Sequence, residues 1–556
     1  MPGRFKMQRP RLQVDHVESA FSGPGGDSRW TNKDLDPIRR EDRKWSVFSL
    51  IAYWFSDAFN AATWEFAASM LAIGLSYKDA IGIVATGFFT VSIVIALNGA
   101  IGVLYHAPFP VLARASWGFW GSYVAIISRV ILAMFWFAIQ TANGGDVVQV
   151  MITAIWPSFA TLPNHIPVTQ GITTAGMISF LLFWLAQVPF LYMHPNNLRH
   201  LFIAKSIIVP ICFIAMLIWA FRSTHGTGGI LLASTAKATI GGPTYSYAWL
   251  SSLTAVIGNY ATLSVNMPDF SRYSRASVKW QWLYVPMLPV VFTFISFCGI
   301  ASTSAALTKY GSLEWNPAAL ISLWPNRACR FFAGFAFALA ALGVNISANS
   351  LSAANDLAAL FPTYVNIRRG QLLCAVIAWV MVPWKILASA GSFLNFMSAY
   401  SVFLGPIGAI LVWDFWWVHK RKYDVVALYH RHSIYRYTYG INWRAILAFL
   451  VGVAPNMPGF ITSVNPKIKV GVGSRPYTFA WLLGFAITSL VYVLASAVFP
   501  PRESMIDRAV LPDEVYEGEV GSVTIEGKAV DGEPGDVEGR GGRRPWGKEE
   551  GELRVL

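Results

Sequence analysis

Between residues 47 and 499 the chain consists of apolar stretches separated by short connections. A helix of about 20 apolar residues spans the hydrocarbon core of a bilayer. Twelve stretches reach about that length: 47–73, 79–104, 122–145, 171–193, 199–221, 246–266, 282–306, 331–360, 371–389, 393–418, 440–462 and 476–499. Residues 147–198 carry no charge, and only 13% of the whole chain is charged. Soluble domains have about 25% charged residues, so the sequence predicts an all-α polytopic membrane protein with about 12 transmembrane helices.

The two ends of the chain differ from this apolar region. Residues 1–46 are polar and contain no apolar core of a signal peptide. Residues 500–556 begin with two prolines and are rich in Gly and Glu, which is typical of disorder. We therefore predict a cytoplasmic N-terminal tail (1–46), a transmembrane domain (47–499) and a disordered cytoplasmic C-terminal tail (500–556).

The net charge of +13 is unevenly distributed. The N-terminal tail has 10 basic and 7 acidic residues, the apolar region 25 and 9, and the C-terminal tail 8 and 14. Basic residues fringe the ends of apolar stretches, and no cluster indicates nucleic-acid binding. An even number of spans places both tails on one side, and the basic N-terminal tail favours the cytoplasm. We expect an integral protein of the plasma membrane with both termini cytoplasmic.

Two apolar stretches carry polar interruptions typical of broken transporter helices. The first contains Asp57, Asn60 and Glu65, and the sixth contains Gly258 and Asn259, followed by Asn266 and Pro268. A helix broken near the membrane midplane exposes backbone groups that bind substrate or ion. Stretches one and six correspond if five helices repeat in inverted orientation, so the pattern favours such a repeat. The alternative is that Gly and Pro are simply common in membrane helices.

The third stretch places Trp136, Gln140 and Asn143 on one helical face, at spacing i, i+4, i+7. An indole can stack on a flat ring, and an amide can donate to and accept from ring N–H and C=O groups. The alternative for Trp136 is packing or a place in an interfacial belt. Its position near the middle of the stretch argues against a belt, so we predict a site for a small planar heterocycle.

The eighth stretch carries a polar stripe formed by Asn345, Asn349, Ser352 and Asp356. Such a stripe does not face lipid. Hydrogen bonds between helices are the alternative role for Ser and Asn in this setting. We predict that Asn349 contacts the substrate.

Ionisable residues at membrane depth are each a functional hypothesis; they are Asp57, Glu65, Asp146, Asp356, Asp414 and Arg129. Burial disfavours the charged form of a carboxylate, which then exchanges a proton as access alternates. We predict that Asp57 and Asp356 couple transport to protons. The alternative is a charge pair with Arg129 or a lysine.

Several short motifs, taken together, resemble the fungal uracil/allantoin permeases of the nucleobase–cation symporter-1 family. The motifs are Asn32-Lys-Asp-Leu-Asp-Pro-Ile38 before Trp45, Phe59-Asn60 with Thr63-Trp64, Trp136 with Gln140, Asn266-Met-Pro-Asp-Phe-Ser-Arg-Tyr273, and Asn345-Ile-Ser-Ala-Asn349. The resemblance covers roughly residues 30–465. It implies a LeuT-like fold, in which two inverted five-helix repeats are followed by two C-terminal helices.

The resemblance also implies roles for individual residues. Trp136 would stack on the base, while Gln140 and Asn349 would form hydrogen bonds with it. The sixth-helix contact falls on Asn259 or Tyr260, and we add Phe59 and Asn60 from the first stretch as substrate-binding residues. A gate in the tenth stretch falls near Leu394 and Met397.

One departure from the family concerns the coupling ion. Sodium-coupled members carry Ser or Thr hydroxyls in the eighth stretch about five residues before the asparagine, where this chain has Gly343 and Val344. A hard cation needs several oxygen ligands, so sodium is disfavoured. We expect proton coupling, no metal site and no other cofactor.

The sequence therefore predicts a secondary active transporter that imports uracil, allantoin or a relative by proton symport with alternating access. Open alternatives are a nutrient sensor or channel of the same fold, or a transporter of a nucleoside or thiamine. An enzyme is not expected, because the nine histidines form no HExxH or similar cluster. The expected partners are the substrate and membrane lipids, without nucleic acid. Lys528 and Lys548 in the C-terminal tail are candidates for ubiquitin attachment by endocytic machinery.

Overall fold

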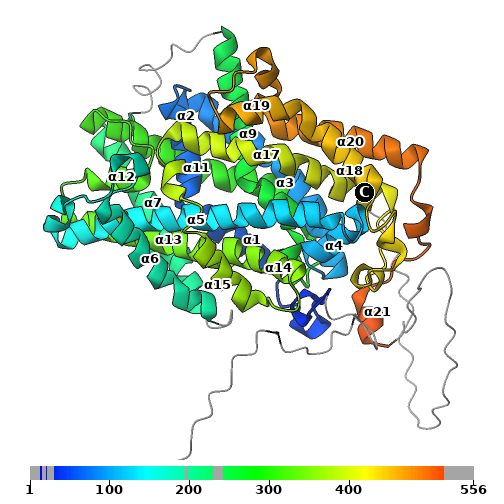
Figure 1. Ribbon diagram of the computed structural model, residues 1–556. Helices are drawn as coiled ribbons and strands as arrows, with labels where there is room; N and C mark the ends of the chain where they lie inside the picture. The colour runs from blue at the N-terminus through cyan, green and yellow to red at the C-terminus, as the bar shows by residue number, and fades with distance from the viewer. Residues whose placement is uncertain (1–12, 15–20, 22–29, 194–197, 230–241, 519–556) are drawn as a thin grey trace, which may run out of the picture.

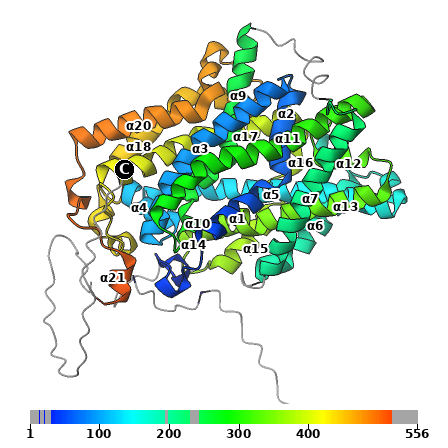
Figure 2. The same ribbon diagram turned by 180° about the vertical axis from the view of Figure 1, so that it is seen from behind.

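A computed structural model describes residues 13–14, 21, 30–193, 198–229 and 242–518, and this part of the chain is nearly all helical (Figures 1 and 2). Its only β-pairing consists of three isolated bridges. The helices are α1 (Val47–Ala58), α2 (Ala61–Ala72), α3 (Tyr77–Tyr105), α4 (Phe109–Trp117), α5 (Ser122–Ile155), α6 (Thr174–Tyr192), α7 (Arg199–Ser223), α9 (Gly242–Asn266), α10 (Pro268–Ser271), α11 (Tyr284–Tyr310), α12 (Pro317–Ser322), α13 (Arg327–Val344), α14 (Leu351–Leu360), α15 (Ile367–Ile377), α16 (Pro383–Ile386), α17 (Ala390–Trp413), α18 (Trp443–Val453), α19 (Met457–Val464), α20 (Ala480–Val498) and α21 (Pro512–Tyr516). Two π-helical segments, Asn345–Ser350 and Asp414–Val418, continue α13 and α17.

All twelve predicted stretches fall on helices. In the described part of the chain, nine helical segments are long and apolar enough to cross a membrane. Of the other three stretches, two are divided: the first forms α1 and α2, and the ninth forms α15 with the short α16. The sixth forms the 25-residue helix α9. The prediction of an all-α polytopic membrane protein is confirmed.

The first stretch breaks where its polar residues predict. Helix α1 ends at Ala58 and α2 begins at Ala61. The Asn60 side chain holds both ends: its Nδ2 donates to the Asp57 carbonyl at 2.6 Å, and its Oδ1 accepts from the Thr63 amide at 3.0 Å. Because one side chain satisfies groups that helix ends leave unpaired, the break is a defined structure.

The sixth stretch breaks later than its sequence suggests. Helix α9 continues through Gly258 and Asn259, and only Met267 separates it from α10. Gly258 instead permits close packing against α17, because a Cβ at this position would lie 2.2 Å from the Met397 carbonyl oxygen. The eighth stretch changes to a π-helical turn at Asn345–Ser350, a feature that is frequent at functional sites.

The helices lie side by side, and the bundle has two recognisable ends (Figures 1 and 2). Helix α12 lies at one end, and α4 and α21 lie toward the other. Helix α5 runs between them and contacts both α4 and α12. We refer below to the α12 end and the α21 end.

Residues 500–518 pack against the rest of the protein, so the prediction of a disordered tail from residue 500 is wrong for this segment. The Val510 amide donates to the Tyr423 carbonyl at 3.0 Å, and the Tyr516 hydroxyl donates to the Pro37 carbonyl at 2.8 Å. Arg43 forms an ion pair with Asp513, and its guanidinium holds the pKa of that carboxyl below the usual range. Residues 519–556, with Lys528 and Lys548, lie outside the described residues.

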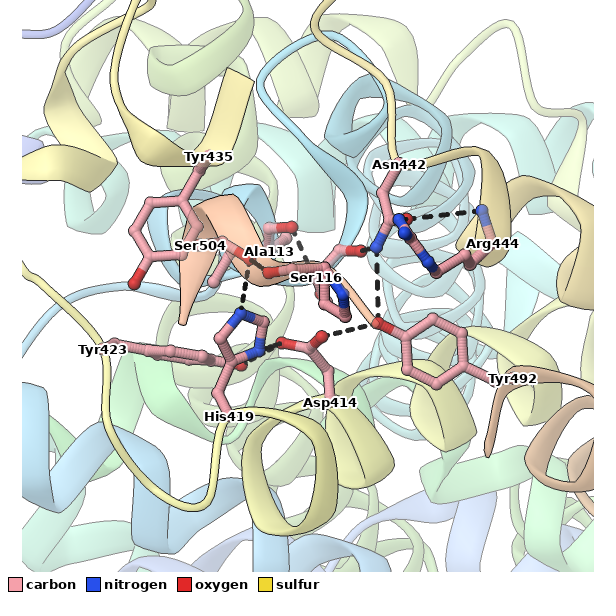
Figure 3. Close-up of polar contacts among 12 residues, drawn as sticks. Ala113, Ser116, Asp414, His419, Tyr423, Tyr435, Asn442, Arg444, Tyr492 and Ser504 are labelled. Atoms are coloured by element: carbon pink, nitrogen blue, oxygen red, sulfur yellow. Dashed lines mark hydrogen bonds and ion pairs between the residues drawn. The ribbon is translucent and has the colours of Figure 1, made fainter. Parts of the chain in front are cut away.

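Asp414 lies in a buried polar cluster where α17 passes into its π-helical segment (Figure 3). Its carboxylate accepts from the hydroxyls of Tyr423 and Tyr492, both at 2.5 Å. His419 Nδ1 lies 3.1 Å from the same carboxylate, while His419 Nε2 contacts Ser504 Oγ at 2.9 Å. The cluster therefore joins α17 and α20 to the segment that follows α20.

We expect an Asp414→Ala variant to be unstable. The substitution leaves two buried tyrosine hydroxyls without their shared acceptor, and a buried donor left unsatisfied costs about 1–3 kcal/mol. The apparent melting temperature of the purified protein should fall by several degrees. The melting temperature of Asp414→Asn, which keeps an acceptor oxygen, should fall less. Equal melting temperatures for the wild type and Asp414→Ala would contradict a structural role.

Candidate functional site

A small internal cavity lies where the break between α1 and α2 faces α5, α9 and the π-helical turn of the eighth span. Its lining includes seven residues predicted from the sequence: Asp57, Asn60, Trp136, Gln140, Asn259, Tyr260 and Asn349. Its volume is about 50 Å³, which suits a few water molecules. A ring-sized ligand requires the walls to move apart.

Helix α5 contributes Trp136 and Gln140 to the cavity. The Trp136 Nε1–H donates to the Tyr400 hydroxyl at 3.2 Å, and that hydroxyl donates to the Gly258 carbonyl at 2.9 Å. The indole is thus held by residues from α17 and α9. The Gln140 side chain is buried, and its Oε1 has no hydrogen-bond partner. An unpaired buried amide oxygen at a cavity wall is available to a ligand that carries a donor.

The polar stripe of the eighth span has two different roles. The Asn345 Nδ2 lies within hydrogen-bond distance of Phe137 O, Thr141 Oγ1 and Gln187 Oε1, at 3.0–3.2 Å. Asn345 is therefore a link between helices. Asn349 lines the cavity, and its Nδ2 donates to Asn345 Oδ1 at 2.9 Å. This contact orients the Asn349 amide and leaves its oxygen for another donor.

The carboxylate of Asp57 lies at the cavity wall beside the end of α1. Its Oδ2 accepts from the Tyr260 hydroxyl at 2.7 Å, and its Oδ1 has no hydrogen-bond partner. Tyr260 comes from α9, so the carboxylate joins the broken first span to the sixth. Asn259, the neighbouring cavity residue, is also buried with an unpartnered Nδ2.

Lys205, on α7, is an ionisable residue at membrane depth that the sequence analysis missed. Its side chain is 1% exposed, and its Nζ has no hydrogen-bond partner. Its charge interacts with that of Asp57. The Lys205 side chain also runs past Gly343, where an added Cβ would lie 2.5 Å from Lys205 Cδ and 3.2 Å from Lys205 Nζ. The absence of a side chain at Gly343 therefore makes room for the lysine.

Asp356 forms a fully buried ion pair with Arg129, the arrangement that the sequence left as the alternative to proton coupling. Arg129 also lies 3.8 Å from Asp269. Asp356 does not line the cavity. Two residues that the sequence analysis had not named as contacts, Asn266 and Ser352, do line it, and the Asn266 Nδ2 donates to Ser352 Oγ at 2.9 Å.

The remaining predicted residues lie away from the cavity. The Phe59 ring packs edge-on against Phe55 and Phe213, with centroids 4.9 and 5.3 Å away. Leu394 and Met397 are buried on α17, where Met397 packs against Gly258 as described above. In the described part of the chain no three His, Cys, Asp or Glu residues are grouped as metal ligands.

Comparisons with known proteins place this arrangement in context. A family described as permeases for cytosine/purines, uracil, thiamine and allantoin matches residues 37–484. The allantoin permease of Saccharomyces cerevisiae is 35% identical over 84% of this chain and 76% of its own length. The uracil permease of the same yeast is 35% identical over 85% of this chain and 77% of its own length.

Among solved structures, the fold is similar to Mhp1, a nucleobase-cation-symport-1 family transporter, in a closed conformation with bromovinylhydantoin bound. The TM-score is 0.68 at 21% identity, covering 88% of this chain and 99% of Mhp1. The inward-facing conformation of Mhp1 gives a TM-score of 0.67 at 20% identity, over 91% and 99% of the two chains. The predicted LeuT-like arrangement is confirmed at the level of the fold.

Proposed function

Because this chain belongs to the family of permeases for cytosine/purines, uracil, thiamine and allantoin, we propose that it imports a small planar heterocycle by proton symport. The cavity is the observation that carries this proposal, since its wall combines the Trp136 indole with the Gln140 and Asn349 amides. The indole offers a flat face for stacking, and the amide oxygens accept from ring N–H groups. Uracil and allantoin, which relatives are named for, both present N–H and C=O groups in this way.

Proton coupling is supported by what surrounds Gly343. Lys205 places an ammonium beside the position where a sodium-coupled member would carry a hydroxyl ligand, and a second cation there would be repelled. Asp57 is the carboxylate next to both the cavity and this lysine. We propose Asp57 as the principal proton-binding group. We propose Asp356 as a second one, whose carboxylate is neutralised either by a bound proton or by its ion pair with Arg129.

Alternating access is supported by the break in the first span and by the size of the cavity. Because about 50 Å³ does not admit a ring, the walls have to separate before substrate can bind, and we propose that they do so on one side at a time. We propose that α17 closes one side through Leu394 and Met397, where Met397 packs against Gly258 of α9. We further propose that the α21 end faces the cytoplasm and that the protein lies in the plasma membrane, with the tail lysines Lys528 and Lys548 as candidate ubiquitin sites.

An uptake panel tests this function. The protein is expressed in a host that lacks its own permeases and is given radiolabelled uracil, allantoin, uridine, thiamine or a purine. We expect saturable accumulation of one heterocycle above the outside concentration, abolished by a protonophore. Equilibration without accumulation would indicate a channel. Absence of uptake of every compound by protein at the cell surface would overturn the proposal and favour a sensor.

A further inference from the structure

The start of α18 and the end of α20 meet in an exposed aromatic and basic site. The rings of Trp443 and Phe499 pack edge to face, with centroids 5.7 Å apart, and both are exposed at the protein surface. The Arg444 guanidinium lies over the Trp443 ring, 5.1 Å from its centroid. Its Nε donates to the Phe499 carbonyl and, as Figure 3 shows, its Nη1 donates to Asn442 Oδ1 at 3.4 Å. We call Asn442, Trp443, Arg444 and Phe499 the Arg444 site.

Contacts with α4 and with the turn that follows it hold this site at the α21 end of the bundle. Asn442 Nδ2 donates to the Ser116 carbonyl of α4 at 2.7 Å. Just before Asn442, the Gly440 carbonyl accepts from the Trp120 amide at 2.8 Å. Tyr439 precedes Gly440 with a φ of 54°, which is strained in a residue other than glycine, and its side chain is 85% exposed. The fastened turn therefore presents a further aromatic ring at the surface beside the site.

Exposed apolar side chains continue from the Arg444 site along both helices. On each helix they share one face, at helical spacing. They are Trp443, Leu447 and Leu450 on α18, and Leu490, Leu494 and Val498 on α20. Helix α20 lies at the edge of the bundle (Figures 1 and 2), and the segments that contain α18 and α20 are long and apolar enough to cross a membrane. In a membrane, these faces contact acyl chains.

The connection between α17 and α18 makes this end of the helices positively charged. Residues 419–444 contain six Lys or Arg residues and a single acidic residue, Asp424. Beyond α20, the exposed Arg502 and Glu503 offset each other. Within the described residues, Arg444 forms no ion pair with a carboxylate. The site is therefore complementary to a negatively charged headgroup, since anionic lipids attract basic segments next to membrane helices.

The Arg444 guanidinium is held in place yet keeps hydrogen-bond donors free. A guanidinium has five N–H groups, and Arg444 uses one on the Phe499 carbonyl and one on Asn442. In the part of the chain that the structure describes, its Nη2 forms no hydrogen bond. Capping the last turn of α20 requires only the Nε hydrogen. The remaining donors suit two oxygens of a phosphate group, which a planar guanidinium binds as a pair.

We propose that the Arg444 site binds one anionic phospholipid, with the phosphate on the Arg444 guanidinium and an acyl chain along the exposed face of α18. Trp443 and Phe499 lie where the acyl chains meet the headgroups, which is the usual place of aromatic residues in membrane proteins. The bound lipid joins the start of α18 to the end of α20. It is separate from the transported substrate, because none of the four residues lines the cavity.

A second copy of the chain is the other occupant that an exposed apolar face could have. Two copies in one membrane have the same orientation, so the two-fold axis of a dimer across this face runs along the membrane normal. Such an axis brings the two positively charged connections, residues 419–444, toward each other, and like charges oppose that contact. An anionic headgroup instead neutralises the charge of Arg444. The distribution of charge therefore favours a phospholipid.

Native mass spectrometry of the full-length protein in detergent tests the site. The protein is titrated with dioleoylphosphatidylserine or dioleoylphosphatidylcholine, and the Kd of the first bound lipid is measured for each. We expect phosphatidylserine to bind about fivefold more tightly, the effect of one basic residue next to an anionic headgroup. In Arg444→Gln the two lipids should bind equally well. Arg444→Lys keeps a donor for the Phe499 carbonyl and serves if Arg444→Gln does not fold; it should bind phosphatidylserine more weakly than the wild type, because an ammonium lacks the planar pair of donors.

Arg475→Gln is the matched control. Arg475 also lies over an aromatic ring, 5.5 Å from the Tyr247 centroid, but it precedes α20 at the opposite end of this helix. The control should keep the preference for phosphatidylserine. Equal affinities of the wild type for the two lipids would overturn the proposal, as would a preference that survives in Arg444→Gln or one that Arg475→Gln loses to the same extent.

Two further outcomes would assign the site to another ligand and would equally overturn the proposal. Glycerophosphoserine carries the same headgroup without acyl chains, so displacement of phosphatidylserine by this compound would show that the site binds a free phosphate and does not use the apolar face. A dimer mass in the wild type that disappears in Arg444→Gln would identify a second copy of the chain as the occupant. We expect neither result, and we expect the wild type to retain phosphatidylserine in the presence of glycerophosphoserine.

Discussion

Replacing Trp136 with alanine should lower Vmax/KM for the transported heterocycle by roughly 5- to 150-fold, because stacking of a base on an aromatic side chain contributes about 1–3 kcal/mol. The loss should lie mainly in KM, since stacking stabilises the bound substrate. Trp136→Phe keeps an aromatic face but loses the Nε1–H that donates to Tyr400. This variant should therefore retain more uptake than Trp136→Ala. Initial rates of radiolabelled uptake over a range of substrate concentrations measure both parameters.

Trp417→Ala is the matched control for this prediction. Trp417 is 43% exposed and lies outside the cavity, so its replacement should leave KM unchanged. Gln140→Ala and Asn349→Ala should each raise KM by about tenfold, the effect of one lost hydrogen bond. Wild-type kinetics in all three cavity variants, with normal surface expression, would refute the assignment of the cavity as the substrate site.

The elements of this fold that the sequence predicts are those set by local composition. Twelve apolar stretches identify the helices because a bilayer requires that length. The break at Asn60 is predictable because a polar side chain in an apolar stretch has to satisfy free backbone groups, and Asn60 does so on both sides. Gly258 shows the limit of this reasoning, because its small size serves packing against Met397 and the helix continues.

The candidate site was predictable where residue type and helical face were sufficient. Trp136, Gln140 and Asn349 face the cavity as the spacing indicates. Asn345 links helices, whereas Asn349 lines the cavity. This difference depends on the contacts of Asn345 with Thr141 and Gln187, which come from other helices.

The sequence analysis missed Lys205 and did not foresee the direction of the Phe59 side chain, for a similar reason. A lysine near the start of an apolar stretch is expected to reach the membrane surface, whereas Lys205 turns inward because Gly343 leaves it space. The backbone turn at the break directs Phe59 toward Phe55 and Phe213 rather than the cavity. In both cases the direction of the side chain depends on a neighbouring helix.

Proton coupling through Asp57 predicts a loss of accumulation without a loss of binding. A pH gradient of one unit corresponds to about 1.4 kcal/mol, so symport of one proton per substrate concentrates the substrate about tenfold. In Asp57→Asn the titrating oxygen is replaced by an amide, while the amide oxygen can still accept from Tyr260. We expect the accumulation ratio in proteoliposomes to fall from about ten to about one. Exchange of labelled for unlabelled substrate at equal concentrations should continue, because it requires substrate binding and alternating access but no net proton movement.

Lys205 provides the complementary test of the same mechanism. Lys205→Met removes the ammonium that interacts with Asp57 but keeps an unbranched side chain beside Gly343. Without this cation the Asp57 carboxylate loses its charged partner and holds its proton more tightly, so proton release becomes harder and net uptake should slow while exchange persists. Asp507→Asn, on the exposed C-terminal segment, is the control and should accumulate substrate as the wild type does. Full accumulation by Asp57→Asn under a pH gradient, or accumulation by the wild type that needs a sodium gradient, would exclude Asp57 as the coupling group.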